Sequence, residues 1–178
     1  MGVSVVAAFT AVNRIDDFAY TPEQNIAHSM TALLAQNKGA RKKNRMQEGF
    51  RCGMVLESIY GIFIFLVCFI FAKPLMCLFV QDEEVIMHGV TYLHLISIMY
   101  ILPAFTNGIQ GFFRGIGDLK ITLISSLVNM TVRVIVAAPL VFSLHLGIEA
   151  LPYSYLAGWI GMLMAELPLL IRTYKAYE

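Results

Sequence analysis

The chain has 178 residues, of which 58% are hydrophobic and 14% are charged, and its net charge is +1. A soluble domain could not cover so much apolar surface, and the near-neutral charge gives no indication of a nucleic-acid partner. The composition indicates an integral membrane protein, so each long apolar stretch is interpreted as a helix in the bilayer.

The first predicted helix, residues 4–35, is unusually polar for a membrane helix. Steps of three and four residues place Asp17, Thr21, Asn25 and His28 on one face. Such a helix crosses a membrane only if this face meets a water-filled cavity or a protein interior, so we predict that these four residues line a substrate cavity. The alternatives are a surface pair with Arg14 for Asp17, helix-to-helix hydrogen bonding for Asn25, and a packed or hydrogen-bonded histidine for His28. Pro22 removes a backbone hydrogen bond, which predicts a kink or local unwinding near the helix centre.

Four further stretches are apolar and long enough to cross a bilayer at about 1.5 Å of rise per residue. The apolar runs 53–72 and 121–142 each contain one charged residue at similar depth, Glu57 in the second helix and Arg133 in the fourth. An arginine cannot lose its charge in the membrane, so we predict a structural ion pair between them, with proton or cation coupling as the alternative. The predicted helices are residues 47–72, 85–113, 120–143 and 152–172.

Side-chain amides supply further candidate cavity-lining residues. Asn107 and Gln110 are polar groups of YILPAFTNGIQGFF, and Asn129 shares a helical face with Arg133. Pro103 and the glycines of the same stretch predict bending and close packing there. Before it, KPLMCLFVQDEEV is predicted to form a short external amphipathic helix.

The basic residues predict how the chain is oriented. Ten of the 13 Lys and Arg residues lie in residues 38–51, 114–120 and 172–175, whereas the alternate connections 73–84 and 143–151 contain Lys73 alone. The positive-inside rule therefore places the C-terminus in the cytoplasm, and the N-terminus outside if the first helix spans. The predicted location is the inner (plasma) membrane, in a multi-pass arrangement.

No pattern typical of an enzyme or a metal site is present. The four histidines are scattered, the three cysteines lack paired metal-ligand spacing, and no HExxH motif occurs. We therefore expect no enzymatic activity, no metal site and no bound cofactor.

Four ordered segments resemble a known family. They are VVAAFTAVNRIDDFAYTPEQNIAHSMTALLAQNKGA, CLFVQDEEVIMHGVTYLHL, GFFRGIGDLKITL and NMTVRVIVAAPLVF. Together they are similar to the C-terminal lobe of the multidrug and toxic compound extrusion (MATE) family, over nearly the whole chain.

The resemblance implies an all-α polytopic membrane bundle of about five transmembrane helices, the last five of a twelve-helix transporter. Residues 1–178 would be a partial C-terminal lobe, and the N-terminal lobe and helix seven would be its missing partners. The family exports small organic cations in exchange for Na⁺ or H⁺, so the implied partners also include those cations, the coupling ion and the lipid bilayer. The fragment alone is expected to be inactive.

One departure from the family pattern concerns the coupling ion. Some members carry an ion-binding aspartate in the helix that contains Asn107, and this stretch has no carboxylate. The sequence therefore argues against a carboxylate-based Na⁺ site in this lobe. Two alternatives to efflux stay open: a membrane scaffold or truncated copy without transport activity, and a lipid-linked sugar flippase of the related superfamily, whose cavity would need several basic residues.

Overall fold

A computed structural model describes residues 3–142 and 150–175 of the chain. Within these residues the fold is entirely helical, which confirms the predicted all-α class. The helices are α1 (Val3–Gly39), α2 (Lys43–Ile70), α3 (Ala72–Cys77), α4 (Glu83–Ser97), α5 (Ile101–Gly115), α6 (Leu119–Phe142) and α7 (Ala150–Lys175).

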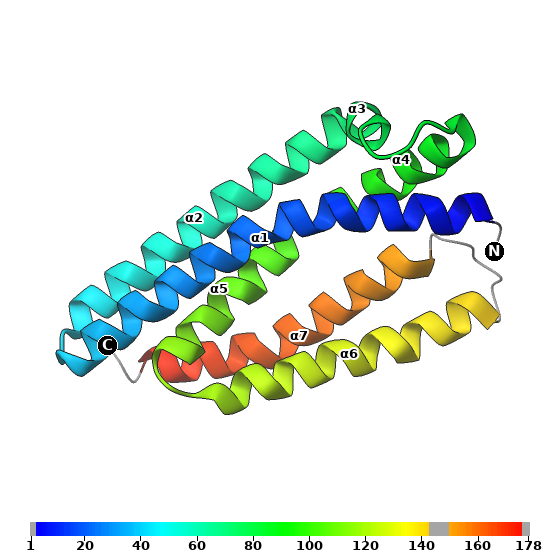
Figure 1. Cartoon of the computed structure of the whole chain (residues 1–178). Helices are drawn as coiled ribbons and strands as arrows, with labels where there is room; N and C mark the ends of the chain where they lie inside the picture. Colours follow the sequence, from blue (N-terminus) through cyan, green and yellow to red (C-terminus); the bar gives the residue numbers. More distant parts are fainter. Residues whose placement is uncertain (1–2, 143–149, 176–178) are drawn as a thin grey trace.

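Helix α1 is the longest element and runs the whole length of the bundle. Its 37 residues remain helical through Pro22, and Figure 1 shows that the helix changes direction near its middle. The predicted kink is therefore present, whereas the predicted alternative of local unwinding is not. At about 1.5 Å per residue the helix is roughly 55 Å long, more than the hydrocarbon thickness of a bilayer.

The predicted single helix 85–113 is instead two helices, α4 and α5, which meet at an angle of 49°. Pro103 explains where the second helix begins, because it lies in the first turn of α5, where a missing backbone N–H costs no intrahelical hydrogen bond. The described residues contain three helices long and apolar enough to span a membrane, α2, α6 and α7, or four if the bent pair counts as one span. The expected number of five spans is therefore approximate. Helix α1 would be the fifth span only if its polar residues were shielded from lipid.

The segment 73–85, predicted to be a short external amphipathic helix, is less helical than expected. Only Ala72–Cys77 forms α3, and the acidic residues that follow belong to the next helix. The Asp82 side chain caps α4 by accepting hydrogen bonds from the backbone N–H groups of Glu84 (2.9 Å) and Val85 (3.2 Å).

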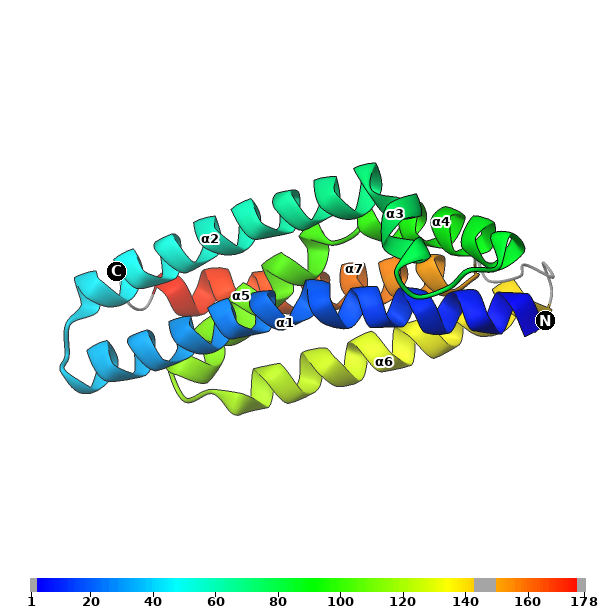
Figure 2. The same cartoon turned by 45° about the horizontal axis from the view of Figure 1, so that its top comes forward.

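The helices form two groups joined by α5. Helices α1 and α2 pack against each other and against α5, and α4 packs against α1 and α2. Helices α6 and α7 pack together and contact this group mainly through α5 (Figure 1; Figure 2). Two apolar cores fill the first group, one around Tyr92 and Tyr100 and the other around Phe112 and Phe113. Helix α5 is therefore the element through which both groups can be coupled.

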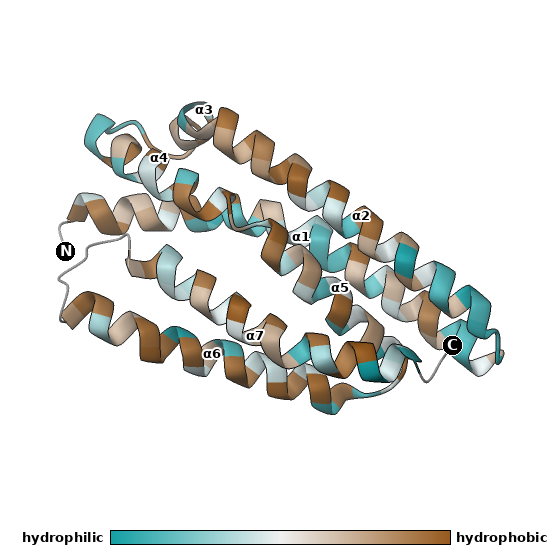
Figure 3. Ribbon diagram, turned by 180° about the vertical axis from the view of Figure 1, so that it is seen from behind, coloured by the Kyte–Doolittle hydropathy of each residue, from teal (hydrophilic) through white to brown (hydrophobic). Residues whose placement is uncertain are grey.

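The two ends of the bundle differ in polarity, as the loop charges predict. The α1–α2 and α5–α6 connections lie at the same end as the C-terminal end of α7 (Figure 1). Figure 3 shows hydrophilic residues gathered at this end, where α1 meets α2. The three basic segments therefore share one end of the bundle, as predicted.

Candidate functional site

Two glutamates are buried at the junction of α1, α2 and α5. The side chains of Glu23 in α1 and Glu57 in α2 are 1% and 0% exposed. Asn107 in α5 donates a hydrogen bond from Nδ2 to Glu23 Oε2 at 3.3 Å. Glu57 packs against Gly108, the residue that follows Asn107 in α5. A Cβ added to Gly108 would lie 3.6 Å from Glu57 Cγ. We call Glu23, Glu57 and Asn107 the carboxyl cluster.

Most oxygens of the carboxyl cluster lack a partner. Glu23 Oε1 and both carboxyl oxygens of Glu57 are buried without any hydrogen bond. The two carboxyl groups lie on α1 and α2, which pack against each other and both against α5. Burying a charged carboxylate without a partner is very costly, so such groups must bind a proton or a cation. The cluster therefore has the chemistry of a site for a proton or a small cation.

The predicted ion pair between Glu57 and Arg133 is wrong. Helix α2 does not pack against α6, and Glu57 has no hydrogen-bonding partner. The guanidinium carbon of Arg133 instead lies 3.7 Å from the ring centre of Tyr155 in α7, a cation–π contact. In the described part of the chain the only ion pair is the exposed one between His88 and Glu84, at 3.9 Å.

Two of the predicted cavity-lining amides join helices instead. Gln110 is buried and donates from Nε2 to Oε1 of Glu166, which is fully buried in α7, at 3.3 Å. Asn129 in α6 is buried and donates from Nδ2 to the sulfur of Met162 in α7 at 3.4 Å. Gln110 and Asn129 therefore lie between packed helices and, contrary to expectation, do not line an open cavity. Between the helices their amides form hydrogen bonds with buried groups of α7.

The polar face of α1 is exposed along its whole length, as its spacing predicts. Asp17, Thr21, Asn25 and His28 are all exposed, and the Thr21 hydroxyl donates to the Asp17 carbonyl oxygen at 2.6 Å. This face is free to meet water or another part of a transporter. Asn107 is half-buried and belongs to the carboxyl cluster.

Two acidic residues lie on the opposite face of α1, where sequence reasoning missed Asp16 and left Glu23 open between cavity lining and bonding between helices. Asp16 is buried and accepts a hydrogen bond from the Tyr100 hydroxyl, and Glu23 belongs to the carboxyl cluster. Both lie in helical step with the buried Ala19 and Ala27. Because the two acidic residues share a helical face with these alanines, the sequence did contain a signal that their carboxyl groups face inward.

Cysteine labelling tests the two faces of α1. After the exposed Cys52 and Cys77 are replaced by serine, Asp17→Cys and Thr21→Cys should react with a water-soluble maleimide in membranes, because these positions are exposed. Ile15→Cys and Ala19→Cys should remain at least tenfold less reactive, because both positions are buried against neighbouring helices. Equal labelling of both sets would contradict a water-accessible polar face.

The fold and the loop charges define a multi-pass helical membrane protein. The family model for MatE matches residues 1–139. The "Probable multidrug resistance protein NorM" of Thermotoga maritima is 23% identical over 150 residues, which cover 84% of this chain and 31% of that protein. The chain belongs to the MATE transporter family, whose members are transporters and not enzymes.

Solved structures of the same family share the fold. An inward-facing MATE family transporter superimposes with a TM-score of 0.89 at 16% identity, covering 94% of this chain and 38% of that one. An outward-facing one superimposes with a TM-score of 0.86 at 16% identity, covering 96% and 37%. The chain thus spans about a third of the length of the proteins it matches, and its bundle resembles the corresponding part of both conformations.

Proposed function

We propose that this chain is one lobe of an inner-membrane efflux transporter, in which the carboxyl cluster binds the coupling cation, a proton or Na⁺. The observation that supports this is the set of three buried carboxyl oxygens without partners at the junction of α1, α2 and α5. Glu23 of α1 accepts a hydrogen bond from Asn107, and Glu57 of α2 lies against Gly108, so the absence of an acidic residue in α5 does not prevent a carboxylate site. Oxygen ligands of this kind suit hard cations.

The exposed face of α1 is proposed to contribute one wall of the substrate cavity. Its members Asp17, Thr21, Asn25 and His28 would face the other lobe of a longer transporter, and small organic cations are the proposed substrates. The fold matches both inward-facing and outward-facing relatives, which supports movement of this lobe as a nearly rigid body. The name of the Thermotoga maritima relative supports multidrug efflux.

A flippase for lipid-linked sugars receives less support. Its cavity would need exposed basic side chains at membrane depth, and the guanidinium group of Arg133 lies on the ring of Tyr155. The carboxyl cluster also offers negative rather than positive groups. Both observations favour cation-coupled efflux over flipping of an anionic lipid.

Ion-dependent stability tests the proposed cation site. The purified chain should melt at a higher temperature either in Na⁺ than in K⁺ or at low than at high pH, because ligand binding to the folded state stabilises it. Glu57→Gln should weaken this dependence and leave the chain folded, since the amide has nearly the same shape and removes one of the two ionisable groups of the cluster. Glu48→Gln, at an exposed position of the same helix, is the matched control and should keep the dependence.

The Na⁺ comparison and the pH comparison together identify the coupling ion. A shift with Na⁺ at constant pH indicates Na⁺ binding, and a shift with pH at constant salt indicates proton binding. Unchanged ion dependence in both Glu57→Gln and Glu23→Gln would contradict the proposed site.

A further inference from the structure

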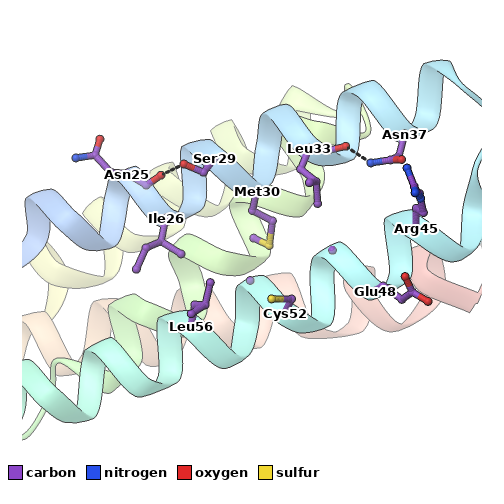
Figure 4. Close-up of a pocket in the computed structure, with 12 residues that line it drawn as sticks. Asn25, Ile26, Ser29, Met30, Leu33, Asn37, Arg45, Glu48, Cys52 and Leu56 are labelled. Atoms are coloured by element: carbon purple, nitrogen blue, oxygen red, sulfur yellow. Dashed lines mark hydrogen bonds between the residues drawn. The ribbon is translucent and has the colours of Figure 1, made fainter.

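A groove separates the cytoplasmic halves of α1 and α2 and encloses about 690 Å³ (Figure 4). This volume lies within the range of pockets that hold small organic ligands. Its apolar wall includes Ile26, Met30, Leu33 and Leu56. Leu33 and Leu56 are 43% and 49% exposed, so the groove is open at the surface of the bundle.

Two of the polar side chains along the groove form hydrogen bonds within α1. The Ser29 hydroxyl donates to the Asn25 carbonyl oxygen at 2.8 Å, and Asn37 Nδ2 donates to the Leu33 carbonyl oxygen at 2.8 Å, as Figure 4 shows. The Ser29 hydroxyl proton and one of the two N–H groups of the Asn37 amide are therefore used within the helix. The middle of the groove presents a mainly apolar surface.

The length of the groove matches one leaflet of a bilayer. Arg45 lies at its cytoplasmic end and Leu56 near its inner end, eleven residues apart on α2, which corresponds to about 16 Å of helix. The hydrocarbon core of a bilayer is about 30 Å thick, so half of it is about 15 Å. An acyl chain that enters from the cytoplasmic interface would fit along this length.

The mouth of the groove is strongly basic. A second hollow of about 500 Å³ shares Arg45 with the groove and is also lined by Arg41, Lys42 and Lys43. None of these four side chains makes an ion pair in the described part of the chain. Glu48, on the groove wall, is a single acidic group against four cations, so the mouth attracts anions and repels an organic cation.

We propose that this groove binds an anionic phospholipid of the cytoplasmic leaflet. The phosphate headgroup would lie at the basic turn between α1 and α2, and one acyl chain would lie along the apolar wall as far as Leu56. Basic residues immediately cytoplasmic of a membrane helix attract anionic lipids, and the one-leaflet groove beside them supplies the place for the chain. This site is separate from the carboxyl cluster and does not depend on the proposed coupling.

Binding of phosphatidylglycerol to the purified chain in detergent tests the proposal, measured by native mass spectrometry. Phosphatidylglycerol should bind at least tenfold more tightly than phosphatidylcholine, and inorganic phosphate alone should not bind. The double variant Arg41→Gln/Arg45→Gln should lose roughly thirtyfold in affinity, since each basic residue contributes about a fivefold factor. Arg172→Gln/Lys175→Gln removes the same charge at exposed positions outside the groove and should bind as the wild type does.

A second pair of variants tests the acyl-chain part of the site. Cys52→Trp fills the groove from an exposed position and should reduce phosphatidylglycerol binding at least tenfold, whereas Cys77→Trp, at an exposed position elsewhere, should not. Equal affinity for both lipids, or equal effects of the two tryptophan variants, would overturn the proposal. Displacement of the lipid by ethidium at equal concentration would also overturn it and indicate a cation site.

Discussion

The 178-residue chain by itself should give no gradient-driven efflux of ethidium from proteoliposomes. Alternating access in transporters of this kind requires one lobe to move against another around a central site. The described helices form a single bundle whose polar α1 face is exposed, and the chain spans about a third of its relatives. The expected result is therefore a complete loss of activity relative to a full-length family member.

The measurement uses imposed Na⁺ and H⁺ gradients in separate vesicle preparations. The intact Thermotoga maritima relative serves as the reference for active efflux, and empty vesicles give the leak rate. Efflux from vesicles that contain only the short chain, above the leak rate and dependent on either gradient, would refute the prediction and make the chain a minimal transporter.

Gly111→Leu should disrupt the packing of α5 against α1. A Cβ at this position would lie 2.9 Å from the Ala27 carbonyl oxygen and 2.8 Å from Met30 Cε. The Thr31 hydroxyl also donates to the Gly111 carbonyl oxygen at 3.1 Å, which holds the two backbones together. Because a backbone atom cannot move aside as a flexible side chain can, we expect a loss of about 3 kcal/mol or more and a melting temperature roughly 10 °C lower.

Thermal unfolding in detergent, followed by circular dichroism, measures this effect. Gly39→Leu is the matched control, because a Cβ there would meet nothing within 4 Å. Its melting temperature should stay within about 2 °C of the wild type. Similar melting temperatures for the two variants would show that α1 and α5 are not closely packed at Gly111.

The exposed face of α1 and the common side of the basic loops could be predicted because both depend on local properties. The positions of Asp17, Thr21 and Asn25 on one face follow from the period of the helix, whatever it packs against. The charge of the segments around Lys38 and Arg172 is likewise independent of the tertiary structure. The family resemblance added the expectation of a transporter lobe, which the family match confirms.

The sequence by itself determined that this is an apolar helical membrane chain, how deep each charge lies along its helix, and which loops share a side. Only the tertiary structure decided that Glu23 bonds to Asn107 and that Glu57 lies against the neighbouring Gly108, while Arg133 lies on Tyr155. The reason is that the rise of a helix gives depth but not neighbours. Which helices adjoin depends on close approaches such as Gly111 against Ala27, and on the bend between α4 and α5, which arise from packing between segments distant in the chain.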